Sequence, residues 1–278
     1  MSALRVLLLM GLAIVGASAC GGGDGSSSGG AGGKGGDGGA GGTTDGGAGT
    51  GGSVIMPACT EPTEVTCTDA ILLDMNLQPD PAPGMLITSA PDGAGWLSTI
   101  DATAGGAFAS TPESYTYGKF TPEGLVKVEI SDEASLGSMD WDIAFRRYVA
   151  RINSGDSGPS CVQAARVPNA KYEDVTSLPD TLTYHPDDYF TESCDFIPDG
   201  SGLESSPATA LSAYWTYPGC VQMSDYVFVI ALADGHHVKL VVDSYYKPDV
   251  QEQCDTTGMV PMGDTGSANF VVRWAYLD

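Results

Sequence analysis

The sequence has 278 residues, and its 35 Asp and Glu residues against 12 Lys and Arg residues give a net charge of −23 at pH 7. An excess of negative charge this large repels polyanions and excludes nucleic acid as a partner. The acidic residues are scattered along the chain, which is typical of a solvated surface. The length suffices for one sizeable domain.

The N-terminal residues have the pattern of an export signal. Arg5 is the only charged residue before a short apolar run, residues 6–15, which is too short to cross a bilayer comfortably. Small residues at 17–19 precede Cys20, as at a lipoprotein processing site. We therefore predict a lipoprotein signal peptide over residues 1–19 and a membrane anchor through lipidated Cys20. Cleavage as an ordinary secretory signal is the alternative.

A glycine-rich segment follows, and together with Cys20 it spans residues 20–52. It holds half of the 38 glycines and is otherwise mostly Ser, Ala, Thr and Asp. This composition buries too little apolar area to offset the entropy of ordering, so we predict a disordered tether. Because a tether serves an anchored protein better than a secreted one, it favours lipidation. Gly21 after the cysteine is compatible with sorting to the outer membrane or cell surface.

Residues 53–278 are predicted to form one all-β domain. Apolar and polar side chains alternate along several stretches, with the period of a half-buried strand. The predicted strands are Met85–Ser89, Tyr115–Phe120, Leu125–Ile130, Asp140–Ile152, Tyr226–Leu232, Val238–Tyr246 and Ala268–Tyr276. Asp234-Gly235 between two alternating runs predicts a hairpin. Residues 153–207 and 247–267 are rich in Pro, Gly, Asp and Ser and predict long loops.

The predicted strand Asp140–Ile152 carries one irregularity. Its apolar face shifts by one position near Arg146-Arg147, which indicates a bulge in a long strand or a bent pair of strands. The residues that follow, Asn153–Pro159, favour turns and left-handed backbone. We therefore predict that this strand leads into a rigid loop.

Six cysteines remain when Cys20 is set aside, an even number in an exported chain. They are Cys59, Cys67, Cys161, Cys194, Cys220 and Cys254. Outside the reducing cytosol such a set predicts disulfides that pin the loops. Proximity favours Cys59–Cys67, and we expect Cys161–Cys194 and Cys220–Cys254 for the rest. Zinc binding is the weaker alternative, because C-x-x-C pairs are absent and histidine is scarce.

The segment Gly155–Pro159, G-D-S-G-P, is similar to the sequence around the nucleophile of chymotrypsin-like proteases. In those enzymes the base histidine precedes the serine, whereas every histidine of this chain follows Ser157. A serine without a base in hydrogen-bond reach is not activated. We therefore interpret the segment as a turn. Since the chain offers no acid–base pair, nucleophile–base pair or metal cluster, we predict that the protein is not an enzyme.

Three blocks of the sequence resemble one known family. W-D-I-A-F-R at Trp141–Arg146 is followed by R-x-N-S-G-x-S-G-P at Arg151–Pro159. The second block is Y-V-F-V-I at Tyr226–Ile230 with the A-D-G turn after it, and the third is Asn269–Trp274. Together they resemble the HmuY family, bacterial haem-binding surface lipoproteins, over roughly Tyr115 to the C-terminus. The resemblance implies an all-β fold with a single antiparallel sheet or a sandwich-like domain.

The same resemblance implies where haem binds. In the HmuY family two loops supply the axial ligands of the iron, one after the N-S-G segment and one before the Y-V-F-V-I strand. At these places the chain has His185 and Met223, which become the ligand candidates, with no metal beyond the haem iron. Tyr184, Tyr189 and Tyr217 are candidates for the pocket wall. The residues alone leave alternatives open, namely an exposed loop histidine and a core-filling methionine.

Together these features predict a lipid-anchored envelope protein that binds haem for iron acquisition and catalyses no reaction. Its expected partners are haem or a related porphyrin, the membrane, and an outer-membrane haem transporter. The alternative is a surface interaction or adhesion module that keeps the β scaffold and does not bind haem.

Overall fold

The computed structural model describes residues 58–104, 113–203 and 205–277. The predicted signal peptide, residues 1–19, and the lipidated cysteine with its tether, residues 20–52, lie outside this part of the chain. All described residues belong to one unit, Gly49–Asp278. No helix that the structure describes is long and apolar enough to span a bilayer.

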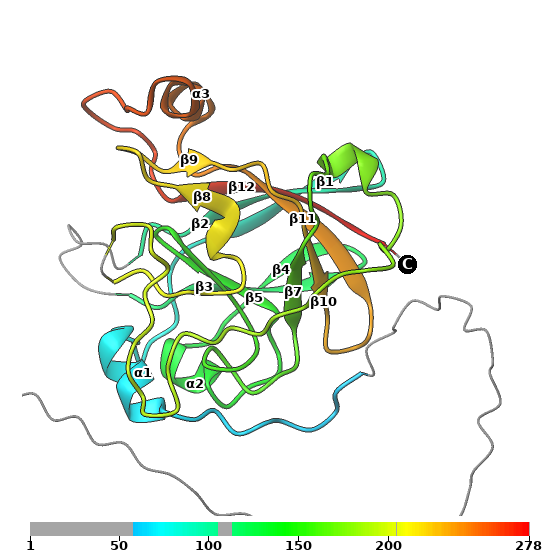
Figure 1. Cartoon of the computed structure of the whole chain (residues 1–278), viewed down its shortest axis with the longest axis vertical. Helices are drawn as coiled ribbons and strands as arrows, with labels where there is room; N and C mark the ends of the chain where they lie inside the picture. The colour runs from blue at the N-terminus through cyan, green and yellow to red at the C-terminus, as the bar shows by residue number, and fades with distance from the viewer. Residues whose placement is uncertain (1–57, 105–112, 204, 278) are drawn as a thin grey trace, which may run out of the picture. The chain divides into compact units, whose positions relative to one another are not determined.

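Antiparallel sheets dominate the unit (Figure 1). A six-stranded sheet has the order β1-β2-β12-β11-β10-β7, with β1 (Leu86–Asp92), β2 (Gly95–Asp101), β7 (Gln163–Arg166), β10 (Phe228–Ala231), β11 (His237–Ser244) and β12 (Asn269–Tyr276). A four-stranded sheet has the order β4-β3-β5-β6, with β3 (Thr116–Thr121), β4 (Gly124–Val128), β5 (Ile143–Arg146) and β6 (Val149–Ile152). A small hairpin pairs β8 (Trp215–Thr216) with β9 (Gln222–Met223).

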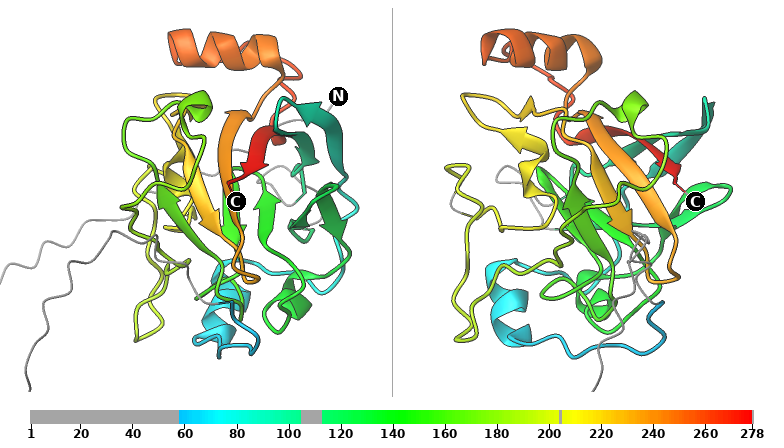
Figure 2. Two further views of the ribbon diagram at one scale, coloured as in Figure 1. Left: turned by 90° about the vertical axis from the view of Figure 1, so that its right-hand side faces the viewer. Right: turned by 45° about the vertical axis from the view of Figure 1, so that its right-hand side comes forward.

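Short helices lie at the ends of the unit. The α-helices are α1 (Thr68–Asp74), α2 (Asp132–Ser135) and α3 (Pro248–Thr257), and two 3-10 turns are η1 (Tyr172–Asp174) and η2 (Ser212–Tyr214). In all the views α3 lies at the end opposite α1 and α2, close to the β8–β9 hairpin (Figures 1 and 2). Pro248 at the first turn and Gly258 with a left-handed φ of 71° after the last turn mark the bounds of α3.

The two larger sheets share one hydrophobic core. Phe145 of β5 packs against Phe270 of β12 with ring centroids 5.0 Å apart. Phe120 of β3 meets Trp274 of β12 edge to face at 4.9 Å. All four rings are at most 4% exposed, so side chains of both sheets interdigitate as in a sandwich. The prediction of an antiparallel all-β domain is confirmed.

The predicted long strand Asp140–Ile152 is a tight hairpin and carries no bulge. β5 and β6 pair antiparallel, and Arg146 faces Val149 across a two-residue turn. Arg147 begins this turn with a positive φ of 53°, and its N–H donates to the carbonyl of Ala102 at 2.6 Å. The shift of the apolar face, which the sequence suggested was a bulge or bend, therefore marks a chain reversal.

Both predicted long loops contain regular structure. Residues 153–207 include β7, which pairs with β10 at the sheet edge, and residues 247–267 include α3. Strand β2 was not predicted, although it pairs with a strand on each side in the six-stranded sheet. The predicted Asp234-Gly235 hairpin is confirmed, because β10 and β11 pair on either side of it.

The disulfide pairing differs from the expectation at two of the three bonds. The pairs are Cys59–Cys161, Cys67–Cys194 and Cys220–Cys254, so only the last was predicted correctly. The Cys59 N–H binds the carbonyl of Ala233 in the β10–β11 loop, whereas Cys67 caps α1. The segment between them runs across the unit and passes Pro159, to which Thr63 is hydrogen-bonded. Cys59 and Cys67 are therefore held at separate places in the unit, and each bonds a cysteine that is distant in sequence.

Candidate functional site

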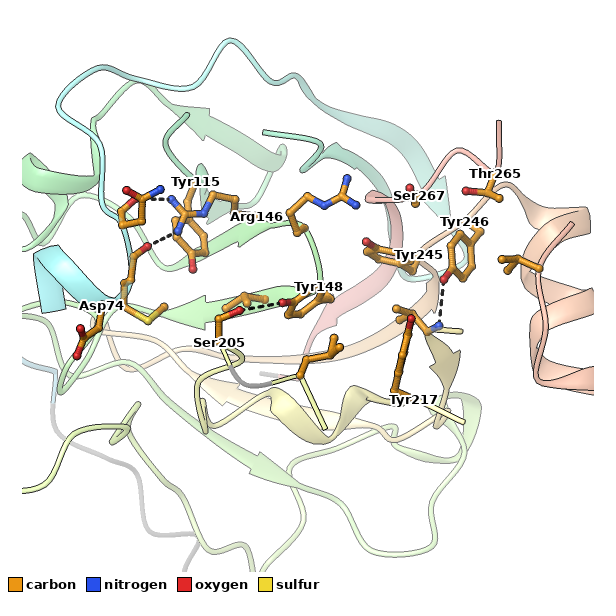
Figure 3. A pocket seen from close by; sticks show the side chains of 17 residues that line it. Asp74, Tyr115, Arg146, Tyr148, Ser205, Tyr217, Tyr245, Tyr246, Thr265 and Ser267 are labelled. Atoms are coloured by element: carbon orange, nitrogen blue, oxygen red, sulfur yellow. Dashed lines mark hydrogen bonds between the residues drawn. The ribbon is translucent and has the colours of Figure 1, made fainter. Parts of the chain in front are cut away.

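A pocket of about 670 Å³ extends along one side of the unit, from the end of α1 to the residues that follow α3 (Figure 3). Ligand sites typically measure roughly 300–1,000 Å³, so the pocket has the size for one small molecule. Its lining comes from the end of α1, the β5–β6 turn, residues 203 and 205, the β8–β9 hairpin, the segment after β11, and residues 260–267 after α3. Segments distant in sequence thus converge here.

At one end of the pocket, Arg146 is held by protein groups. Its Nη1 donates to Asp132 Oδ2 at 3.2 Å and to the Asn76 carbonyl at 3.1 Å, and its Nη2 donates to the Met75 carbonyl. Its guanidinium also lies 4.2 Å from the centroid of the Tyr115 ring. These contacts satisfy the charge of Arg146 within the protein, so this end of the pocket is structural.

A second guanidinium supports the same ring from inside the protein. Arg151 is fully buried, lies 4.1 Å from the Tyr115 centroid, and donates to the Tyr117 hydroxyl at 2.7 Å. Its Nε and Nη1 have no hydrogen-bond partner among the described residues. The aromatic rings around it therefore provide much of its stabilisation through cation–π contacts.

At the other end, two tyrosines that follow β11 form the wall. The rings of Tyr245 and Tyr246 meet edge to face at 4.8 Å and are 2% and 7% exposed. Buried Gln251 of α3 accepts hydrogen bonds from the backbone N–H of both, at 2.9 and 3.1 Å. Its amide nitrogen donates to the carbonyl of Val221 at 3.0 Å. Since Val221 also lines the pocket, α3 fixes this wall through one side chain.

A disulfide holds α3 in the position that this wall requires. Cys254 of α3 is bonded to Cys220, which directly precedes Val221. Asp255 adds a carboxylate oxygen that accepts from the Met223 N–H at 2.8 Å. The helix and the β8–β9 hairpin therefore form one cross-linked side of the pocket.

The tyrosine hydroxyls at this end keep their protons. Burial raises the pKa of Tyr245, and the positive charge of Arg147 opposes this effect. Burial likewise raises the pKa of Tyr246. The Tyr246 oxygen accepts from the Val221 N–H at 3.0 Å, which leaves its proton available for donation. The Tyr245 hydroxyl has no hydrogen-bond partner among the described residues and points toward the middle of the pocket (Figure 3).

The two predicted axial ligands lie outside this lining. His185 is exposed, and its backbone forms an isolated bridge with Ala164 of β7, at 3.0 and 2.9 Å. Met223 is 9% exposed and packs in the main core beneath the β8–β9 hairpin. Neither side chain lines the pocket. Ligation of iron by His185 and Met223 stays a prediction.

Of the three predicted wall tyrosines, the structure brings one to the pocket. Tyr217 is 44% exposed and lines it. Tyr189 is fully buried, and its hydroxyl binds Ser157 at 3.1 Å. Tyr184 is half-buried beside His237, and burial raises its pKa to about 12. Among the residues described, no group of three or more His, Cys, Asp or Glu side chains could hold a metal ion.

Sequence reasoning missed the residues that shape the pocket most, namely Arg147, Tyr245 and Tyr246. Arg147 was assigned to an irregularity within a strand, and the two tyrosines to a strand end. The signal that was available is the reversal of alternation at Arg146-Arg147, which indicates a turn as readily as a bulge.

The fold and the pocket define an antiparallel β protein with a tyrosine-walled site of ligand size. The model of the HmuY protein family matches residues 108–258. Because this match covers more than half of the chain, the protein belongs to the HmuY family.

Three solved structures are similar to the chain at low identity. A candidate HmuY-like haem-binding protein from Bacteroides vulgatus is 15% identical, with a TM-score of 0.44 over 69% of this chain and 97% of that chain. A candidate lipoprotein from Bacteroides fragilis is 13% identical, with a TM-score of 0.44 over 69% and 95%. An apo HmuY analogue from Tannerella forsythia is 15% identical, with a TM-score of 0.37 over 70% and 97%. No curated protein matches the chain.

Proposed function

We propose that this protein binds haem in the pocket walled by Tyr245 and Tyr246 and passes it on without chemical change. Membership of the HmuY family, whose members are haem-binding surface lipoproteins, supports this function. The observation that carries it is the pocket itself, whose size suits a porphyrin and whose lining includes five tyrosines. Cargo transfer to an outer-membrane haem transporter follows as the proposed physiological step.

The pocket lining contains residue types that bind haem iron in other proteins. Phenol oxygens and thioethers are haem ligands in proteins, and the lining includes several tyrosines and Met75. Histidine and cysteine are missing from the described lining residues. The Tyr245 hydroxyl, which keeps its proton, is placed to donate a hydrogen bond to the cargo, whereas ligation of iron by the predicted pair would recruit His185 and Met223 from outside the lining.

Absorption spectroscopy tests whether the protein binds haem and which side chains contact it. Titration of the purified protein with haemin is expected to shift the Soret band and to saturate at one equivalent. Tyr245→Phe, which keeps the ring and removes the hydroxyl, is expected to weaken haemin binding and to leave the Soret position of the complex unchanged. His185→Ala and Met223→Leu test the other ligand pair, since leucine preserves the packing of the buried site. A spectrum identical to that of free haemin would instead favour the surface interaction module.

The membrane anchor belongs to the same proposal. Cys20 would carry the lipid that holds the protein at the outer membrane or cell surface, with residues 1–19 removed as the signal peptide. Metabolic labelling with palmitate in the native host is expected to tag the wild-type protein. Cys20→Ala should abolish the label and release the protein from the membrane fraction, and a label that persists would contradict lipidation at this position.

A further inference from the structure

The end of the pocket near α3 is rich in hydrogen-bond donors. Thr265 and Ser267 line it beside Tyr245 and Tyr246 (Figure 3). The hydroxyls of Thr265 and Ser267, like that of Tyr245, have no hydrogen-bond partner among the described residues. Each of them can donate to a ligand, so this end offers several donors to one acceptor group.

One arginine of the lining is uncommitted. Arg147 is half-buried, and its guanidinium has neither a hydrogen bond nor an ion pair within the described part of the chain. Its charge acts on the tyrosine end, since it lowers the pKa values of Tyr245 and Tyr246 against the effect of burial. By contrast, the neighbouring Arg146 is held by Asp132 and backbone carbonyls and is unavailable to a ligand.

The backbone conformation at Arg147 also favours a role for its side chain in ligand binding. Its φ of 53° lies in the left-handed region, where glycine or asparagine is preferred in a two-residue hairpin turn. An arginine in this conformation is strained, and strain of this kind concentrates at functional sites. A folding role alone would be met better by glycine, so the side chain of Arg147 is the feature that the turn presents.

Among the described residues, the lining of this end of the pocket contains no acidic side chain. Asp74 is the only acidic residue among the described residues that line the pocket, and it lies at the opposite end from Thr265 and Ser267 (Figure 3). The chain as a whole carries a net charge of −23, so it repels free anions from most of its surface. An uncommitted guanidinium among hydroxyl donors is therefore a local exception in this protein.

We infer that Arg147, together with the hydroxyls at the tyrosine end of the pocket, binds a carboxylate of the ligand. The pocket would thereby select planar apolar molecules that carry an acidic side chain. This inference rests on the proposed function and makes it more specific: with haem as cargo, Arg147 pairs with a propionate while the porphyrin lies along the aromatic wall. A planar guanidinium matches a carboxylate in a two-point hydrogen bond, and the neighbouring hydroxyls complete the acceptor's shell.

The test compares haemin with haemin dimethyl ester, which keeps the porphyrin and iron but has no free carboxylate. Both are titrated into the purified wild-type protein, and tryptophan quenching and the Soret band report the dissociation constants. Haemin is expected to bind about 10- to 100-fold more tightly than the ester, the range of one charge-assisted hydrogen-bond pair. Equal affinities would overturn the inference and leave the proposed function standing. Binding of neither molecule would overturn both.

Variants of the turn separate recognition from folding. Arg147→Gly suits the positive φ, so its apo form is expected to unfold at the same or a higher temperature than wild type. It should nevertheless lose most of the preference for haemin over the ester, and Arg147→Lys should restore part of that preference. The control is Arg166→Gln, which removes the same charge from an exposed arginine of β7 beside Tyr226, outside the pocket. An equal loss in Arg166→Gln would assign the effect to net charge and overturn the inference.

Discussion

The hydroxyl of Ser157 donates a hydrogen bond of 2.6 Å to the carboxylate of Asp187, and both side chains are fully buried. The same carboxylate accepts from the N–H groups of Ile152 and Ala210 at 2.9 and 2.8 Å. Ser157 thus connects the loop after β6 to a second loop and to the segment before η2. The protease-like G-D-S-G-P segment is a structural tie, in agreement with its interpretation as a turn.

Ser157→Ala is expected to destabilise the fold by about 1–3 kcal/mol, because it removes a hydrogen bond to a buried carboxylate. Urea denaturation followed by tryptophan fluorescence measures this difference. Ser193→Ala, at an exposed serine in the same long segment, is the matched control and should change the free energy of unfolding by less than about 0.5 kcal/mol. Equal effects in the two variants would contradict the tie.

Two buried carboxyls give the stability a defined pH dependence. Burial raises the pKa values of Asp142 and Asp187 from 3.8 to about 6. In the folded state these groups therefore bind protons at a pH where the unfolded chain has released them. Their contribution is most favourable below pH 4 and is lost as the pH rises through about 6.

We accordingly expect the free energy of unfolding to increase when the pH is lowered from 7 to about 5, by on the order of 1 kcal/mol from each carboxyl over this interval. Urea denaturation at a series of pH values measures this slope. Asp142→Asn should flatten it, since the amide oxygen can still accept from the Phe120 N–H as the carboxylate does at 2.9 Å. A stability that falls steadily from pH 7 to 5 would contradict the expectation.

The strands were predictable where one face is buried and the other is exposed to solvent. In β11 buried positions such as Val238 and Leu240 flank the half-buried Lys239, and the run was recognised. β7 is short and has no clear alternation, so it could not be recognised by period. In β5 and β6 most positions are buried on both faces, which hides the two-residue turn between them.

The site was less predictable than the fold because its residues come together only through tertiary contacts. Gln251 is an ordinary polar residue in a segment expected to be a loop, yet it orients both Tyr245 and Tyr246. In the sequence, Arg147 cannot be told apart from Arg146 next to it. Only the hydrogen bonds of the structure show that the Arg146 guanidinium is held by Asp132, whereas that of Arg147 has no such partner among the described residues. Neither distinction is encoded in residue type or spacing.

The disulfide pairing can be checked by mass spectrometry of a non-reduced digest. We expect peptides linked through Cys59–Cys161 and Cys67–Cys194, which close loops of 102 and 127 residues in sequence separation. On the chain-entropy model a loop of that size stabilises by about 4–5 kcal/mol. Replacing Cys67 and Cys194 together with serine should therefore lower the stability by several kcal/mol.

The remaining disulfide, Cys220–Cys254, provides the comparison. It has a sequence separation of 34 and joins α3 to the pocket wall. Its removal should cost less stability, about 3–4 kcal/mol on the same model, and should weaken haemin binding more than loss of the Cys67–Cys194 bond does. A linked peptide containing Cys59 and Cys67 would contradict the observed pairing.

Gln251 should determine both the stability of the fold and the shape of the pocket. Its amide oxygen accepts from two buried N–H groups, and its nitrogen donates to Val221 and to Asp255, the latter at 2.9 Å. Gln251→Leu leaves these groups buried without partners, so we expect a loss of about 2–4 kcal/mol. Gln253→Leu, the same change at an exposed position of α3, is the control and should have little effect.

Gln251→Glu separates the two roles of this side chain. A glutamate can still accept from the N–H groups of Tyr245 and Tyr246, but it replaces the donor to the Val221 carbonyl and to Asp255 with a carboxylate oxygen, which the carboxylate of Asp255 repels. We therefore expect the tyrosine wall to persist while α3 loosens from the β8–β9 hairpin. Hydrogen exchange of the α3 amides should accelerate in this variant, with the strands of the six-stranded sheet unchanged. Exchange that accelerates equally in the sheet would mean that Gln251 acts on global stability alone.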